Sequence, residues 1–154
     1  MKLKKKTDSR SLASTRHKAR HYAVQALYQW QLNRITVNEI EAQFRIEYDM
    51  KGVDIGYFHE LLLEGTKQSD TLDAIVEPLI TDRAIDEVDP VTRSLLRMSI
   101  YELKDRIDVP YRVVINEAIN FAKKFGPEDS QKFVNGILDK AAKSLRSIEV
   151  NAEK

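Results

Sequence analysis

Residues 16–30 read RHKARHYAVQALYQW, a stretch with helical periodicity that carries aromatic side chains on more than one side. At about 100° per residue, five side chains share one arc of such a helix: Ala19, Tyr22, Ala23, Ala26 and Trp30. We expect this arc to face the core, because its three alanines let a second helix approach closely. Ser14 and Thr15 are suitable N-caps, and the helix is predicted to run to about Asn33.

The opposite side of this helix is also partly apolar. Tyr28 lies about 160° from Ala26, and His17, His21 and Val24 lie around it. A surface helix with one apolar face is expected to be polar on the other. Two interpretations remain open: another helix of the same domain covers this side, or a protein partner does. Tyrosine is favoured at interfaces, so Tyr28 and Val24 are candidate partner contacts.

Charge is unevenly distributed along the chain. Residues 1–20 hold eight bases and one acid, whereas the whole chain has a net charge of only +1. Residues 36–90 hold fourteen acids and four bases, and residues 91–154 hold twelve bases and nine acids. An acidic middle segment repels phosphate, so a nucleic-acid surface is expected to combine the N-terminal arm with the C-terminal third. The competing interpretation is a solvated arm that only aids solubility.

Arg16, Lys18 and Arg20 are the arm's candidate phosphate contacts. Cations at a helix N-terminus oppose the macrodipole at a cost of a few tenths of a kcal/mol each, which a bound anion would offset. His17 and His21 have the i, i+4 spacing of metal ligands, but no acid follows at the positions that would complete a site. We therefore expect no metal or other cofactor, and we expect these histidines to join the basic arm and titrate with pH.

The remaining chain reads as further helices with short loops. The predicted ranges are 37–48, 55–78, 90–106, 110–125 and 129–146. The fold class is therefore all-α, a compact single-domain bundle of about six to seven helices. Residues 1–14 are predicted to be a disordered basic extension, residues 15–147 the helical RNA- and protein-binding domain, and residues 148–154 a flexible tail.

The C-terminal third contains three further candidates. Glu117 lies beside apolar residues and is expected to satisfy an arginine or a helix end. Gly136 is costly inside a helix, so we expect close contact there with the alanine-lined first helix. Lys132 suits a phosphate, and Phe133 either stacks on a base or belongs to the core.

Several classes of protein are disfavoured. The chain has no cysteine, which excludes disulfides and thiolate metal sites and fits a cytoplasmic protein. No apolar run approaches about 18 residues, so no membrane span is expected. The basic start lacks the apolar segment of a secretory signal, and a mitochondrial transit peptide is disfavoured because helical periodicity begins directly afterwards. No phosphate-binding loop, nucleophile elbow or zinc-protease motif occurs, so we expect no enzyme.

Three groups of residues resemble the NusB family of bacterial transcription antitermination factors. They are residues 16–20 with 23–28, residues 96–98 with 101–103 and 109–110, and residues 116–126 with 132–139. The resemblance spans about residues 16–146. It implies an all-helical, non-catalytic protein that binds boxA, a single-stranded RNA element of ribosomal RNA leader transcripts. It also implies pairing with NusE, a small-subunit ribosomal protein, in an antitermination complex on RNA polymerase.

The resemblance also implies site residues. Arg16, Lys18 and Arg20 match the family's RNA-contacting start, and Asp129 and Lys132 match positions near its RNA-binding edge. Tyr28 matches a position on the NusE surface. A family acid that is also tied to NusE aligns with Thr92 here, and the nearest acid is Asp89.

Two alternatives to a standalone antitermination factor remain. One is the related accessory domain of ribosomal RNA cytosine methyltransferases, and the other is a pure protein-interaction bundle. An exposed apolar ridge would also permit a homodimer.

Overall fold

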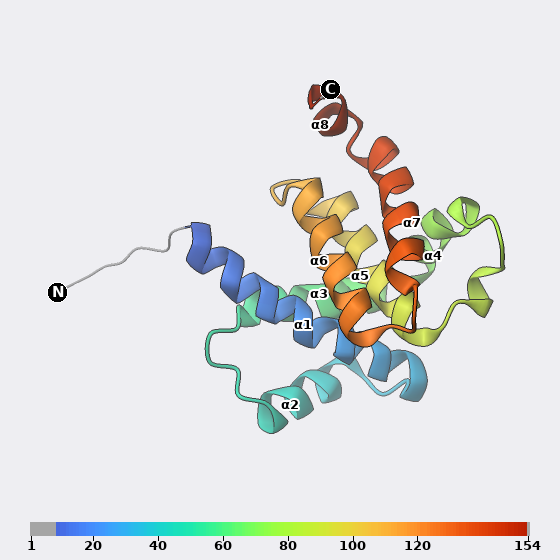
Figure 1. Ribbon diagram of the computed structural model, residues 1–154. Coiled ribbons are helices and arrows are strands. Elements are labelled where there is room, and N and C mark those ends of the chain that lie inside the picture. Colours follow the sequence, from blue (N-terminus) through green and yellow to red (C-terminus); the bar gives the residue numbers. More distant parts are fainter. Residues whose placement is uncertain (1–8, 154) are drawn as a thin grey trace.

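The computed structural model describes residues 9–153, and between them the chain forms helices and no strand (Figure 1). The all-α prediction is confirmed. Its α-helices are α1 (Ser9–Asn33), α2 (Val37–Glu47), α3 (Ile55–Lys67), α4 (Ser69–Val76), α5 (Pro90–Asp105), α6 (Tyr111–Phe125), α7 (Ser130–Leu145) and α8 (Ser147–Ala152). Two 3₁₀ turns, η1 (Glu77–Leu79) and η2 (Ile85–Glu87), lie between α4 and α5.

Helix α5 is the centre of the bundle and packs against α1, α3, α4, α6 and α7 (Figure 1). Every residue from 94 to 103 is buried. Pro90 occupies its first turn and Asp89 is its N-cap, where the Thr92 amide donates to the Asp89 carboxylate at 3.0 Å. Because α5 is enclosed, its Arg97 and Glu102 require partners inside the protein.

Helices α1 and α3 approach closely at a glycine. A Cβ on Gly65 of α3 would lie 2.9 Å from Leu27 Cδ2 of α1, closer than real Cβ contacts. The close contact that the sequence predicted at Gly136 does not occur. A Cβ on Gly136 would have no heavy-atom neighbour within 4 Å, because this side of α7 faces solvent.

At both ends of the chain, helices extend beyond the predicted bounds. Helix α1 begins at Ser9 rather than near Ser14, so residues 9–14 are helical and not disordered. The rest of the predicted disordered extension, residues 1–8, lies outside the described residues. The predicted flexible tail forms α8 through residue 152, because a Glu149 carboxylate oxygen accepts from the Tyr111 amide at 2.9 Å and so docks α8 on the start of α6.

The predicted helix over residues 55–78 divides at Gln68 into α3 and α4. This division and α8 account for the difference from the six to seven helices predicted. No helix between residues 9 and 153 has both the length and the apolar character needed to cross a membrane.

Candidate functional site

Arg20, predicted to contact RNA, points into the protein, and this part of the prediction is wrong. Its side chain is only 3% exposed. Its Nη2 lies 2.9 Å from a carboxylate oxygen of Glu102 on α5, and its Nη1 lies 2.9 Å from one of Glu117 on α6. Because its N–H groups already pair with two carboxylates, this guanidinium cannot bind a phosphate through two parallel hydrogen bonds. The prediction that Glu117 satisfies an arginine is confirmed.

The charges of this buried cluster are fixed by its neighbours. Burial lowers the pKa of Arg20, but the carboxylate of Glu102 outweighs that effect and raises the pKa above its usual value. The hydroxyl of Tyr57 donates to Glu102, and burial together with that carboxylate raises the Tyr57 pKa. The cluster therefore holds a permanent cation and a neutral phenol around one carboxylate, which suits a structural role.

Arg16 is also largely engaged within the fold. Its guanidinium lies over the Tyr57 ring at 4.7 Å, and its Nη1 lies 3.6 Å from a carboxylate oxygen of Asp108. Arg106 hydrogen-bonds the same carboxylate and lowers the pKa of Asp108 to about 2. With its side chain 19% exposed, Arg16 can offer an anion only part of its guanidinium.

The basic side chains along this part of α1 are Lys18, which is exposed and lies over Gly52, and two histidines, which lie against α6. The His17 ring stacks on Phe121 at 5.2 Å, and its Nδ1 lies 2.8 Å from a Glu117 carboxylate oxygen. The His21 ring lies 5.3 Å from that of Phe125 and 3.3 Å, at Nδ1, from Lys124 Nζ. Burial lowers the pKa of His21, and the charges of Lys124 and His17 lower it further. We call Lys18, His17, His21 and Lys124 the basic edge.

The basic edge joins the N-terminal arm to the C-terminal third, as the charge pattern predicted. It shows no metal site: across residues 9–153, no cluster of three metal-ligating side chains occurs. His17 is instead satisfied by Glu117, and His21 faces the Lys124 cation, which repels a metal.

Asp129 and Lys132 lie at the start of α7, and both are exposed. Asp129 has a φ of 67° and its side chain caps no helical amide, so its carboxylate faces solvent. Phe133 is partly buried against the core, and the Arg83 guanidinium lies 4.5 Å above its ring. Lys132 is therefore accessible to an anion, whereas much of the Phe133 ring is already covered.

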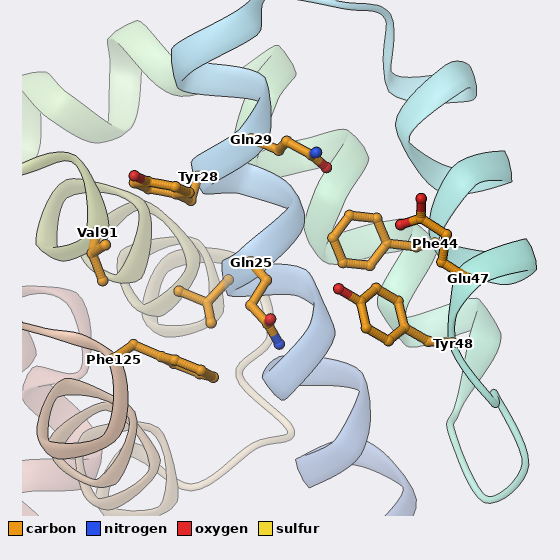
Figure 2. Close-up of a pocket in the computed structure, with 9 residues that line it drawn as sticks. Gln25, Tyr28, Gln29, Phe44, Glu47, Tyr48, Val91 and Phe125 are labelled. Carbon is orange, nitrogen blue, oxygen red and sulfur yellow. The ribbon is translucent and has the colours of Figure 1, made fainter.

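Tyr28 borders a groove of about 390 Å³ on the surface of α1 (Figure 2). The groove is lined by Val24, Gln25, Tyr28, Gln29, Phe44, Glu47, Tyr48, Val91 and Phe125. Tyr28 is partly buried and lies beside Val91 of α5, with Phe125 of α6 below it in this view. An apolar groove with amide groups along one helix suits a protein segment.

Two of the candidate partner positions, Val24 and Thr92, are nearly enclosed, although Val24 still lines the groove. Val24 is 2% exposed and Thr92 is also 2% exposed. Val24 is enclosed because α1 packs against α2, α3 and α5. Thr92 lies in the first turn of α5, where its amide is held by Asp89. The alternative in which other helices of the domain cover this side of α1 is therefore correct for Val24.

Three residues that form the site were not identified from the sequence: Glu102, Tyr57 and Tyr48. Glu102 and Tyr57 form the buried cluster with Arg20, and the signal for Glu102 was its place among apolar residues of a helix predicted at 90–106. Tyr48 helps to form the groove. It continues the apolar spacing of Ile40 and Phe44 in the helix predicted at 37–48, so the periodic pattern could have found it.

Comparisons with known proteins agree with this architecture. A sequence model of the NusB family matches residues 17–143. The transcription antitermination protein NusB of Teredinibacter turnerae is 54% identical over 140 residues, which cover 91% of this chain and 95% of that protein. The corresponding protein of Aeromonas salmonicida is 52% identical over 132 residues, covering 86% and 96%.

Solved structures show the same fold. NusB of T. maritima superimposes with a TM-score of 0.74 at 30% identity, covering 83% of this chain and 90% of that one. A chain of the crystal structure of antitermination factors NusB and NusE in complex with double-stranded RNA gives 0.68 at 25% identity, covering 89% and 99%. With its sequence match, its all-helical bundle and its two-sided first helix, this chain belongs to the NusB family.

Proposed function

We propose that this chain is a transcription antitermination factor that binds boxA RNA of ribosomal RNA leader transcripts together with NusE, and thereby supports antitermination by RNA polymerase in the cytoplasm. The observation that carries the proposal is the division of α1 into two accessible surfaces. The basic edge lies toward one end of the helix, and the Tyr28 groove lies toward the other. Relatives named as antitermination proteins support the same function, which requires no catalysis.

The RNA surface in this proposal consists of exposed lysines, with Arg16 contributing in part. Lys18 and Lys124 lie on the basic edge, and Lys132 lies at the start of α7 beside Asp129. Lysine ammonium groups act on phosphates as point charges, which gives affinity with little sequence preference. The partly exposed His21 ring, which lies beside Phe125, is a candidate stacking surface for an unpaired base.

The protein surface in this proposal is the Tyr28 groove. Its walls are mainly apolar, and Tyr28 contributes a ring with a polar end, as is common at interfaces. A homodimer that used this groove would compete with NusE, and light scattering with and without NusE distinguishes the two partners.

A titration of labelled boxA RNA, with and without NusE, tests the function. We expect NusE to strengthen binding, and we expect a scrambled strand to bind more weakly at matched salt, a comparison that removes non-specific charge effects. A boxA duplex serves as a further competitor, since the related complex contains double-stranded RNA. Equal affinity for the boxA and scrambled strands would contradict the proposal.

Tyr28→Asp tests the protein surface separately. The charge would enter an apolar groove at the point of contact, so affinity for NusE should fall by about tenfold or more, equivalent to at least about 1.4 kcal/mol. Isothermal titration calorimetry measures the loss, and circular dichroism confirms the fold. Ile107→Asp is the matched control, because Ile107 is 74% exposed and lies outside the groove. Unfolding of Tyr28→Asp would instead show that Tyr28 is a core residue.

A further inference from the structure

The Tyr28 groove continues past Gln25 into a recess between α1 and α2 (Figure 2). Phe44 lies in the last turns of α2 and Tyr48 follows its end, and both rings point toward α1. The two ring centroids are 5.1 Å apart at an interplanar angle of 39°. Tyr48 is 39% exposed, although its ring also lies 5.1 Å from the ring of Tyr22. We call this recess, formed by Phe44, Tyr48, Glu47, Gln25 and Gln29, the aromatic notch.

The polar groups of the notch offer unused hydrogen-bond acceptors. Glu47 is exposed, its carboxylate has one weak contact, from Gln43 Nε2 at 3.4 Å, and no cation of the described chain lies within 4 Å of it. Gln29 Oε1 is buried and, within residues 9–153, accepts no hydrogen bond. Gln25 is held by its Nε2, which donates to the His21 carbonyl at 3.0 Å. The notch therefore combines aromatic faces, a carboxylate and an amide oxygen that lacks a donor.

We propose that the aromatic notch binds an arginine side chain of the protein that docks at Tyr28, an inference that rests on the proposed function. A guanidinium is planar and carries five N–H donors, so it can stack on the Tyr48 ring while it donates to Glu47. The charge of the notch favours a cation, because among the described residues Glu47 is the one charged residue that lines the groove and its carboxylate has only the contact from Gln43.

Other occupants fit less well. An apolar side chain would cover Glu47 and the Gln29 oxygen without satisfying either, which costs free energy. An RNA phosphate would be repelled by Glu47 and by the acidic segment around it. A lysine would supply the charge, but it lacks the planar donor fork and stacks less well on an aromatic ring.

Calorimetric titration with NusE measures the contribution of the notch. We expect Glu47→Gln to weaken NusE binding by about threefold to tenfold at low salt and to reduce the salt dependence of the affinity. Tyr48→Leu, which keeps an apolar surface but removes the ring, should also weaken binding. Asp70→Asn is the matched control, because Asp70 is an exposed acid of the same acidic segment that lies on α4 outside the groove.

A double-mutant cycle identifies the bound side chain. Each arginine of NusE is changed to alanine and combined with Glu47→Gln, and we expect one pair whose effects on affinity are non-additive. The arginine-binding proposal is wrong if Glu47→Gln and Tyr48→Leu bind NusE with wild-type affinity, or if the effects are additive in every cycle. If the notch variants have no effect but Tyr28→Asp abolishes NusE binding, the proposed function stands and only the arginine-binding proposal fails. If the wild-type chain does not bind NusE, both proposals fail.

Discussion

Arg20 and Lys18 lie two residues apart on α1 and play different roles. Lys18 is exposed, whereas Arg20 is enclosed between Glu102 and Glu117. Arg20→Met would preserve much of the side-chain volume but leave two carboxylates without their cation. We expect the free energy of unfolding to fall by about 3–5 kcal/mol, as for other buried pairs that lose one member. Urea denaturation measures this change.

Lys18→Met is the matched control for that substitution. Its side chain faces solvent, so stability should change by no more than about 0.5 kcal/mol. The two variants should rank in the opposite way for RNA affinity. Lys18→Met should weaken RNA binding. Folded Arg20→Met should bind RNA as the wild type does, because the exposed cations remain in place. A stable Arg20→Met protein with reduced RNA affinity would show that Arg20 contacts RNA directly.

His21 should make stability depend on pH. Its pKa is lowered from 6.5 by burial and by the nearby charges of Lys124 and His17. Below about pH 6.5 the unfolded chain therefore binds more protons at this residue than the folded chain does. The free energy of unfolding should consequently decrease as pH falls from 7 toward the folded-state pKa.

Urea denaturation at pH 7.5 and 6.0 measures this slope, and we expect His21→Gln to reduce it. NMR titration of the His21 ring provides a direct check, and Lys124→Gln should raise the observed pKa because it removes a neighbouring cation. A His21 pKa at or above 6.5 in the free protein would contradict this account.

At the scale of helices, Gly65 and Gly136 are opposite cases. Gly136→Ala adds a methyl group in open space and should stabilise α7 by about 0.8–1 kcal/mol through helix propensity. Gly65→Ala gains the same propensity but places its Cβ 2.9 Å from the buried Leu27 side chain, so repacking should cost about 1–3 kcal/mol. Thermal unfolding of the two variants gives the comparison. Equal stabilisation by both would show that α1 and α3 can separate freely.

Helix boundaries with local chemical signals could be predicted from the sequence. The capping box of Thr36 and Glu39 begins α2 at Val37, and Asp89 with Pro90 begins α5, close to the predicted boundaries. The division at Gln68 has no such signal, since neither glycine nor proline marks it. The early start of α1 and the formation of α8 were missed because polar, charged residues gave no periodic pattern.

The candidate site could be predicted only in part, because a helical wheel gives the direction of a side chain but not its neighbour. It correctly separated Tyr28 from the alanine face. It could not show that α5 and α6 supply the carboxylates that draw Arg20 inside, or that neighbouring helices cover Val24. Long-range contacts of this kind depend on how the helices pack, which local periodicity does not determine.

Among residues 9–153, the buried cations are all arginines, although Arg34, Arg45, Arg83 and Arg112 are exposed. The buried or partly buried arginines pair with internal acceptors: Arg20 with Glu102 and Glu117, Arg97 with Asp73, Arg106 with Glu60 and Asp108, and Arg146 with Glu149. Lys18, Lys123, Lys124 and Lys132 remain exposed. On α1, α6 and α7, the positive charge available to a polyanion is therefore carried mainly by lysines, although the sequence pattern pointed first to arginines.

This distribution of buried arginines and exposed lysines predicts which cations set the salt dependence of RNA binding. Each lysine that contacts a phosphate of single-stranded RNA contributes about 0.7 to the slope of log affinity against log salt concentration. We expect Lys18→Ala and Lys132→Ala each to reduce the slope by about that amount, measured by fluorescence anisotropy of labelled boxA RNA across a salt series. Lys67→Ala is the control, because Lys67 is also exposed but ends α3 within the acidic segment. An equal reduction in all three variants would mean that RNA responds only to net charge, whereas a reduction confined to Lys18 and Lys132 would locate the RNA along α1 and the start of α7.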